Sequence, residues 1–247
     1  MCFGDDARPP EPPTPGIVGD HGELLLRSAD GTQFNAYYAY PTARARSAIV
    51  VMPDVRGLHR FYQELAQRFA EAHLLAVAID YFGRTTPFAS TRDEGFPYRE
   101  HVEQMRPEHV AADVGSAVGW LRGNGDHNVS SVFTVGFCRG GSLSWAQSAE
   151  GHGLAGCVGF YGDPSLVVDR IPDFADPLLL LAAGQDHTPV EEVEQFAEQV
   201  RARGVEAEMH VYPDAPHSFF DRTSEQYAKE CDDAWRRILA FVDSHST

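Results

Sequence analysis

The chain has 247 residues, a formal net charge of -16 and 43% hydrophobic residues. This length and apolar content are enough for one sizeable α/β core, and we predict a single domain over residues 17–247. The strong negative charge argues against nucleic acid or an anionic membrane surface as a partner, because phosphate binding requires clustered lysine and arginine.

The cysteines indicate a reducing compartment. Cys2, Cys138, Cys157 and Cys231 show neither Cys-x-x-Cys spacing nor the density of a disulfide scaffold. No stretch approaches the length of about 20 apolar residues that spans a bilayer, and the N-terminus lacks the basic-then-apolar pattern of a signal peptide. We therefore predict a cytoplasmic protein without a membrane partner.

The first 16 residues are rich in proline, with Pro9, Pro10, Pro12, Pro13 and Pro15. Such a composition does not form a packed helix or strand. We predict a disordered or extended N-terminal arm over residues 1–16.

Strands and helices alternate through the rest of the chain. We predict an edge hairpin over residues 23–27 and 33–40, then strands over residues 47–52, 74–79, 129–135, 154–161, 176–184 and 205–212. Helical spacing of apolar residues predicts helices over residues 61–72, 110–121, 140–149, 188–203 and 224–242. Thr188 and Glu191 suggest a capping box at the fourth of these. Residues 81–104 have little periodicity, as expected of a binding loop or lid.

This alternation predicts an α/β fold with a mostly parallel, doubly wound sheet and helices on both faces. In such a sheet functional residues gather at the carboxyl ends of the strands. Position at a strand end is therefore a test for each candidate site residue.

One strand end carries a nucleophile motif. Gly136-x-Cys138-x-Gly140 has the spacing of the strained strand-to-helix turn called the nucleophile elbow, with a thiol in place of the more usual hydroxyl. Glycines flanking the nucleophile let strand and helix approach each other closely. The alternative interpretation is a buried structural cysteine beside a glycine-rich turn.

Two further strand ends complete a catalytic triad. Asp186 follows the strand that contains Leu178–Leu181, and His217 follows the last predicted strand. The order nucleophile, acid, histidine is that of α/β-hydrolases. A thiolate can attack, an imidazole can move the proton, and a carboxylate can orient the imidazole. We therefore predict Cys138, Asp186 and His217 as catalytic residues.

Other residues compete for these roles. Asp214 is a rival acid, and His187 is a rival base whose side chain we expect to point away from that of Asp186. Any single histidine is more often structural than catalytic. We predict no metal site, because no His-x-x-x-His or Cys-x-x-Cys pair supplies ligands at standard spacing.

The loop after the strand over residues 47–52 completes the predicted site. We expect an oxyanion hole made by the backbone N–H groups of Arg139 and Val55. Asp54 precedes Val55. It could be a surface carboxylate or could contact the thiol.

These residues resemble the dienelactone hydrolase family, within the α/β-hydrolase superfamily, from about residue 22 to residue 241. The matching pieces are the Gly-x-Cys-x-Gly-Gly elbow and residues 158–162, 184–187 and 215–219. The resemblance implies hydrolysis of an enol lactone or related ester by a Cys-Asp-His triad through an acyl-enzyme, as in a carboxymethylenebutenolidase. It implies no cofactor and a small-molecule substrate.

The resemblance also implies roles for one acid and two arginines. Asp54 takes the place of a family glutamate that hydrogen-bonds to the resting thiol. Arg84 and, with one extra intervening residue, Arg222 resemble two arginines that hold a substrate carboxylate. Each arginine could equally be a solvated surface charge, as could Arg56 and Arg139 beside the expected oxyanion donors.

The sequence leaves three functions open. The first is a cysteine-dependent ester or lactone hydrolase of the dienelactone hydrolase type. The second is a general esterase or thioesterase on the same scaffold, and the third is a thiol sensor or binding protein without a reaction. The oligomeric state stays open.

Overall fold

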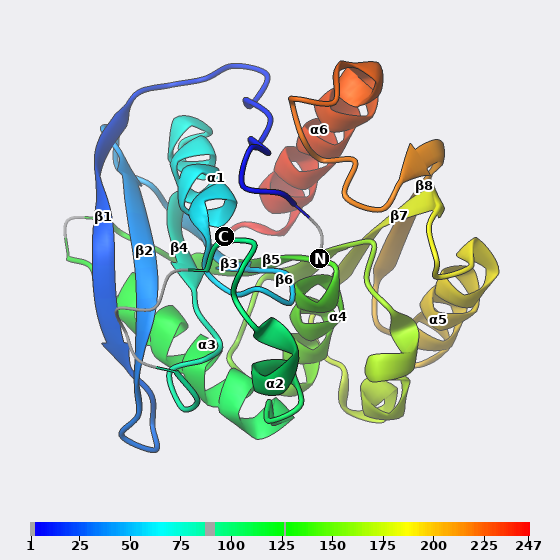
Figure 1. Cartoon of the computed structure of the whole chain (residues 1–247), viewed down its shortest axis with the longest axis horizontal. Helices are drawn as coiled ribbons and strands as arrows, with labels where there is room; N and C mark the ends of the chain where they lie inside the picture. The colour runs from blue at the N-terminus through cyan, green and yellow to red at the C-terminus, as the bar shows by residue number, and fades with distance from the viewer. Residues whose placement is uncertain (1–2, 87–91, 126) are drawn as a thin grey trace.

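We describe the protein from a computed structural model, over residues 3–86, 92–125 and 127–247. The centre is an eight-stranded sheet in the order β1-β2-β4-β3-β5-β6-β7-β8 (Figure 1). Its strands are β1 Val18–Arg27, β2 Gln33–Pro41, β3 Ser47–Met52, β4 Leu75–Ile79, β5 Ser131–Phe137, β6 Gly156–Phe160, β7 Leu178–Gln185 and β8 Ala207–Pro216. The six strands from β4 to β8 in the sheet order, β4-β3-β5-β6-β7-β8, are parallel to one another. The β1–β2 hairpin pairs antiparallel with β4 through β2.

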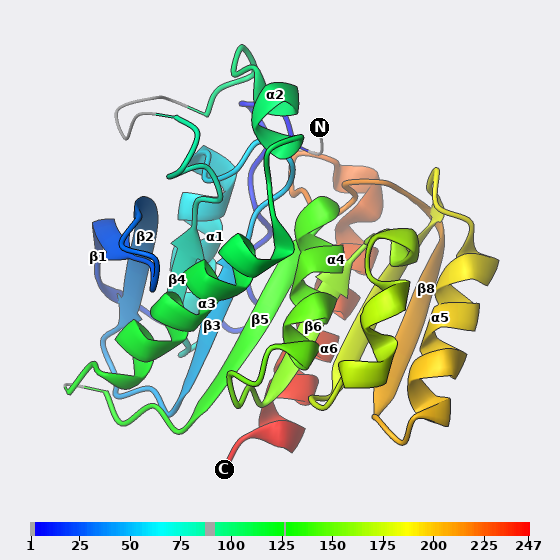
Figure 2. The ribbon, with the colours of Figure 1, turned by 90° about the horizontal axis from the view of Figure 1, so that it is seen from below.

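Helices cover both faces of the sheet, as Figure 2 shows. The main helices are α1 Arg60–Glu71, α3 Pro107–Arg122, α4 Arg139–Ala146, α5 Val190–Ala202 and α6 Ala228–His245, and α2 Tyr98–Val102 is a single short turn. The buried residues of α1 and α6 pack in one core, and those of α3, α4 and α5 pack in the other. The predicted doubly wound α/β architecture is confirmed.

Some local predictions differ from the structure. The loop over residues 81–104 contains α2, and its residues 87–91 lie outside the described residues. Helix α5 begins after Pro189 without a side-chain cap, so the predicted capping box of Thr188 and Glu191 is wrong. Strand β8 continues to Pro216, four residues beyond the predicted strand end at 212. An edge strand tolerates proline because the missing N–H leaves no ladder bond unmade.

The N-terminal arm, residues 3–16, packs along the molecule between α1 and α6 and is not a free tail (Figure 1). The side chain of Phe3 is 1% exposed and stacks on Phe61 with ring centroids 3.7 Å apart. The indole N–H of Trp235 donates to the carbonyl of Pro10, and the N–H of Arg222 donates to the carbonyl of Arg8. Proline prevents a helix here but leaves carbonyl acceptors and an extended chain, so the arm docks by side-chain burial.

None of the helices in the described parts of the chain combines the length and apolar character that crossing a bilayer requires.

The packing of the arm gives a stability prediction. Phe3→Ala should lower the free energy of unfolding by about 3 kcal/mol, the usual cost of removing a buried aromatic ring. Ile17→Ala, at a side chain that is 71% exposed, is the matched control and should stay within about 0.5 kcal/mol of the wild type. Urea denaturation of the full chain measures both, and equal effects of the two variants would show that the arm does not contribute to stability.

Candidate active site

The turn after β5 holds Cys138 in a conformation that few residues adopt. Its φ of 57° and ψ of -123° lie in a strained region for a residue with a side chain. A Cβ atom on Gly136 would overlap the carbonyl oxygen of Gly140, and one on Gly140 would overlap the carbonyls of Met52 and Pro53. Close backbone contacts therefore require glycine at both flanking positions. The turn holds the partly buried Cys138 at the carboxyl end of β5, a central strand of the sheet.

Asp186 and His217 lie side by side because of the pairing between β7 and β8. The register shifts between Ala183 and Gln185, so that Gln185 pairs with Pro216 and the next residue on each strand faces the other. The imidazole Nδ1 of His217 lies 2.8 Å and 2.9 Å from the two carboxylate oxygens of Asp186. A hydrogen bond also joins His217 to Cys138. The structure thus brings the three predicted catalytic residues together.

The charges at this site favour an ionised pair. Burial alone would lower the pKa of His217, but hydrogen bonds with Asp186 and Cys138, and the negative charges of both, raise the pKa to about 9. Burial alone would raise the pKa of Asp186, but the hydrogen bond and charge of His217, followed by the charge of His187, lower that pKa below its ordinary value. His217 is therefore protonated and Asp186 ionised at neutral pH.

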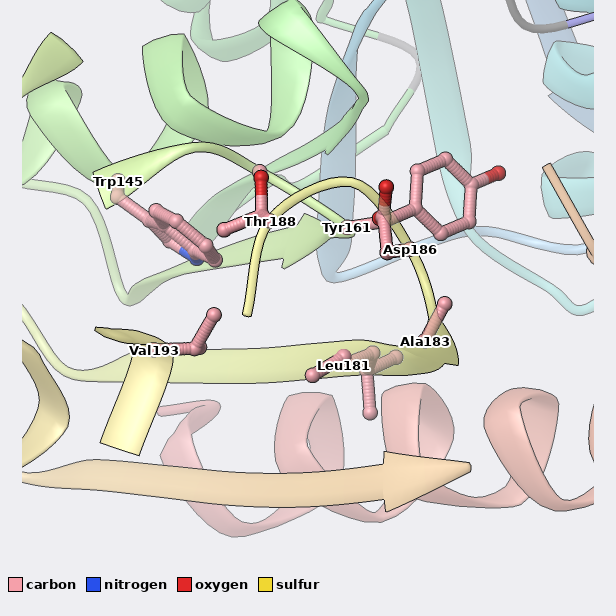
Figure 3. Close-up of a pocket in the computed structure, with 9 residues that line it drawn as sticks. Trp145, Tyr161, Leu181, Ala183, Asp186, Thr188 and Val193 are labelled. Carbon is pink, nitrogen blue, oxygen red and sulfur yellow. The ribbon is translucent and has the colours of Figure 1, made fainter. Parts of the chain in front are cut away.

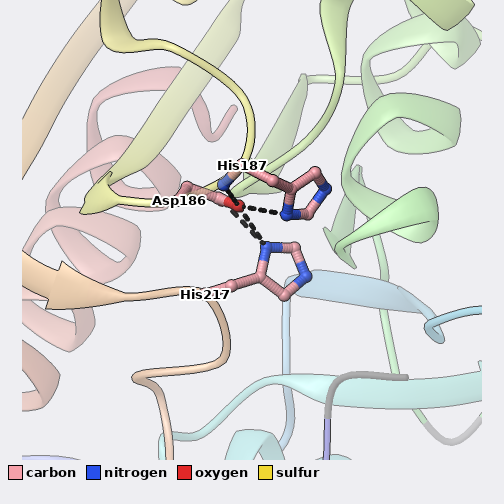
Figure 4. Close-up of side chains that lie close together, drawn as sticks. All are labelled: Asp186, His187 and His217. Carbon is pink, nitrogen blue, oxygen red and sulfur yellow. Dashed lines mark hydrogen bonds and ion pairs between the residues drawn. The ribbon is translucent and has the colours of Figure 1, made fainter.

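His187 also contacts Asp186, contrary to our expectation. Its Nδ1 lies 2.6 Å from Oδ1 of Asp186, and its ring centroid lies 4.7 Å from that of His217 (Figure 4). Neighbouring side chains point apart in a regular strand, but His187 lies in the bend after β7, where that alternation has ended. The side chain of His187 is 71% exposed and that of His217 is 19% exposed.

The same three side chains are a possible metal-binding group. Ligand atoms of Asp186, His187 and His217 all lie within 4.8 Å of one another, although the sequence shows no standard metal spacing. The donor set of one oxygen and two nitrogens suits a transition metal such as zinc. However, the Nδ1 atom of His217 is already hydrogen-bonded to the carboxylate, which is the arrangement of a proton-transfer pair.

Asp186 lines a small pocket. Figure 3 shows residues that line it, among them Trp145, Tyr161, Asp186, Thr188 and Val193. The side chain of Asp186 is only 2% exposed. These neighbours keep water from the carboxylate, which strengthens its interaction with His217.

Asp54 is fully buried after β3 and is not a surface carboxylate. Its Oδ1 accepts a 2.8 Å hydrogen bond from the N–H of Arg56, and its Oδ2 lies 3.6 Å from Nε2 of His59 and 3.5 Å from the N–H of Phe3. Burial favours the neutral acid, but the hydrogen bond and charge of His59 hold the pKa of Asp54 below its ordinary value. An ionised carboxylate therefore lies in the loop after β3 that contains Val55, which we call the oxyanion loop.

Sequence reasoning missed two residues of this neighbourhood, His59 and Tyr81. Nothing in the sequence marked the partner role of His59, whereas Tyr81 had a usable signal because it closely follows the end of β4. The hydroxyl of Tyr81 donates to the carbonyl of Pro53 at 2.8 Å. Burial, and then the charges of nearby acidic groups including Asp54 and Cys138, raise the pKa of Tyr81 well above its ordinary value. Tyr81 is thus a neutral donor to the loop after β3.

The two predicted oxyanion donors are available. Arg139 is the first residue of α4, and the close approach of Gly140 to the carbonyls of Met52 and Pro53 brings this end of α4 against the loop that contains Val55. Within residues 3–86, 92–125 and 127–247, neither the N–H of Arg139 nor that of Val55 donates to a protein acceptor. Both N–H groups can therefore bind an oxygen that bears negative charge.

The two arginines expected to bind a substrate carboxylate have protein partners instead. Arg84 pairs with both oxygens of Asp113, at 2.8 Å and 3.0 Å, and with Asp30 at 2.9 Å. Arg222 pairs with Glu11 of the arm at 2.9 Å. The structure therefore brings neither guanidinium group into the cluster around Cys138 as an unpaired cation.

The parallel sheet, the strained turn at Cys138 and the carboxylate–imidazole pair at the strand ends define the α/β-hydrolase class. The chain matches the profile of the dienelactone hydrolase family over residues 34–246, and it belongs to that family. The predicted family and the predicted enzyme class, a hydrolase of the ester and lactone type, are confirmed.

Several known proteins are similar to this chain. A protein of Salmonella typhi, provisionally named a carboxymethylenebutenolidase, is 30% identical, with 85% of this chain and 83% of the relative covered. The carboxymethylenebutenolidase of Pseudomonas putida is 25% identical, with coverages of 83% and 88%. The crystal structure of a provisionally named dienelactone hydrolase from Klebsiella pneumoniae superposes with a TM-score of 0.78 at 27% identity, covering 92% of this chain and 98% of that one.

The raised pKa of His217 gives a prediction for the pH profile. For an ester with an alkoxide leaving group, kcat/KM should fall as pH rises through about 9, because neutral His217 can no longer protonate the leaving group. Asp186→Asn should move this fall to lower pH, since it removes a charge that favours the imidazolium. Steady-state rates between about pH 6 and 10 measure the profile.

His187→Ala is the matched control for this profile. It removes the other imidazole on Asp186 and should leave the fall in kcat/KM near pH 9. A profile that moved in His187→Ala and not in Asp186→Asn would assign the titrating group to His187.

Proposed function

We propose that this protein hydrolyses carboxylic esters or lactones through an acyl-enzyme on Cys138, with His217 and Asp186 as the other catalytic residues. The observation that carries the proposal is the series of hydrogen bonds from Cys138 through His217 to Asp186 at the carboxyl ends of the strands. The reaction needs no cofactor.

In the first half of the reaction, the thiolate of Cys138 attacks the ester carbonyl carbon and forms a tetrahedral intermediate. The N–H groups of Arg139 and Val55 stabilise its oxyanion. His217 donates its Nε2 proton to the leaving alkoxide as the carbon–oxygen bond breaks, which leaves a thioester on Cys138. In a lactone the alkoxide stays attached to the same molecule.

In the second half, His217 takes a proton from a water molecule, and the resulting hydroxide attacks the thioester. The carbon–sulfur bond then breaks, which releases a carboxylic acid and restores the thiolate and the imidazolium. Asp186 accepts a hydrogen bond from Nδ1 of His217 throughout, which fixes the tautomer and offsets the imidazolium charge. Asp54, in the loop beside the oxyanion donors, would act on the resting thiol, and a reducing compartment would keep that thiol available.

The second candidate is a general esterase or thioesterase on the same scaffold. The pairing of Arg84 with Asp113 and Asp30, and of Arg222 with Glu11, supports it, because neither arginine is left as a ready clamp for a substrate carboxylate. A non-catalytic thiol sensor has less support, because the strained turn, the imidazole and the two oxyanion donors are parts that a sensor does not need.

Replacing the nucleophile tests the proposal. Cys138→Ala should lower kcat for an activated ester by about 10⁴-fold or more, because the covalent route is lost. Cys157→Ala is the matched control: burial raises the pKa of that thiol far above its usual range, so it is inert and its loss should change kcat by no more than about three-fold. Turnover by Cys138→Ala at the wild-type rate would refute the mechanism, and alkylation of Cys138 without turnover of any ester would favour the sensor.

A further inference from the structure

The N-terminal arm reaches the oxyanion loop. The N–H of Phe3 donates to Oδ2 of Asp54 at 3.5 Å, and the carbonyl of Phe3 accepts from the guanidinium of Arg56. That guanidinium also donates to Oδ1 of Asp5 at 2.6 Å. Asp54 and Arg56 are the residues on either side of Val55, whose N–H is an expected oxyanion donor. The arm therefore holds both neighbours of that donor.

The ring of Phe3 contacts the strand that carries the nucleophile. Its centroid lies 6.1 Å from the ring of Tyr62 on α1 and 6.2 Å from that of Phe137, and both pairs are edge to face. Phe137 ends β5 and directly precedes Cys138. The hydroxyl of Tyr62 accepts a 3.0 Å hydrogen bond from the N–H of Asp54. One buried ring therefore packs against both the end of β5 and the side chain that supports the oxyanion loop.

The same arm joins two further loops at strand ends. The N–H of Arg8 donates to Oδ1 of Asp221 at 3.0 Å, and Asp221 lies four residues after His217. The N–H of Asp5 donates at 2.8 Å to Glu94, in the loop after β4, and the N–H of Glu94 donates to Asp5 at 3.1 Å. The first residues of the arm thus connect the loops that follow β3, β4 and β8.

Burial makes these contacts necessary for the oxyanion loop. The side chain of Arg56 is fully buried and is not a surface charge, and the arm supplies a carboxylate and a carbonyl that its guanidinium contacts. A buried guanidinium without such partners is strongly unfavourable. If the arm withdrew, the loop would have to move Arg56 towards water, and Val55, the preceding residue, would move with it.

Resting on the proposed function, we infer that the arm is a positioning segment for the reaction, in which Phe3 and Asp5 hold the oxyanion loop so that the N–H of Val55 can stabilise the oxyanion. Both residues act through the two neighbours of Val55 and are not catalytic residues. The N–H of Val55 meets a full negative charge only in the tetrahedral intermediate and the transition state that leads to it. Loss of the arm contacts should therefore lower kcat and leave KM nearly unchanged.

The first test removes the exposed carboxylate of the arm, whose loss need not unfold the protein. Asp5→Ala should lower kcat for an activated ester by at least about 10-fold, with KM within about two-fold of the wild type, because a displaced oxyanion donor loses part of its contribution. Asp5→Glu, which keeps the carboxylate, should recover most of the rate. Asp6→Ala is the matched control: Asp6 is exposed and makes no ion pair within the described residues, so its loss should leave kcat at the wild-type value.

A second measurement separates the position of the loop from the state of the nucleophile. Alkylation of Cys138 by iodoacetamide, followed by peptide mapping, needs a thiolate and no oxyanion donor. Its rate should therefore stay within about two-fold of the wild-type rate in Asp5→Ala and Phe3→Ala. Equal falls in the alkylation rate and in kcat would show a general disturbance of the site and overturn the inference.

Hydrogen exchange reports on the loop without the reaction. Amide exchange in the peptide over residues 54–58, followed by mass spectrometry, should be at least about ten-fold faster in Asp5→Ala and Phe3→Ala than in the wild type or Asp6→Ala. Unchanged exchange, or faster exchange without a fall in kcat, would overturn the inference. A wild type that hydrolyses no activated ester would refute the proposed function and with it the role of the arm in that reaction, whereas wild-type turnover by Asp5→Ala would refute the role of the arm alone.

Discussion

The pairing of β7 with β8 is the constraint on which the site depends. A single register shift at the end of these strands places Asp186 opposite His217, and the hydrogen bond between them orients the imidazole. Between Ala183 and Gln185 the paired residue on β8 advances from Tyr212 to Pro216, and this extra length of β8 brings His217 level with Asp186. The strained turn at Cys138 then needs only to present sulfur to an imidazole that the sheet has already placed.

The segments around the site are tied together by charge. The arm and the loop after β4 meet through Asp5 and Glu94, each of whose carboxylates accepts a hydrogen bond from the backbone N–H of the other. Arg92 anchors the described part of that loop to Asp80 at 2.7 Å and lies over the ring of Phe96. These contacts hold the arm and the described part of that loop against the end of β4.

The sequence predicted the parts of the structure that local patterns determine. Apolar runs predicted the buried strands, and glycine spacing predicted the turn at Cys138, because close backbone contacts exclude a side chain there. Strand ends then predicted Asp186 and His217. The pairing of Arg84 with Asp113 and of Arg222 with Glu11 could not be predicted, since the partners lie 29 and 211 residues apart in the chain. The docking of the arm was missed for the same reason, because Phe3 is buried only by residues that the fold brings to it.

The most direct test of this account is the identification of the covalent intermediate. The full-length protein is mixed with an activated ester, quenched with acid in the first turnover, and digested for mass spectrometry. The account predicts an acyl group on the peptide that contains Cys138, present before steady state and lost as product forms. Ester hydrolysis with that peptide unmodified throughout, or with the acyl group on a different residue, would contradict it.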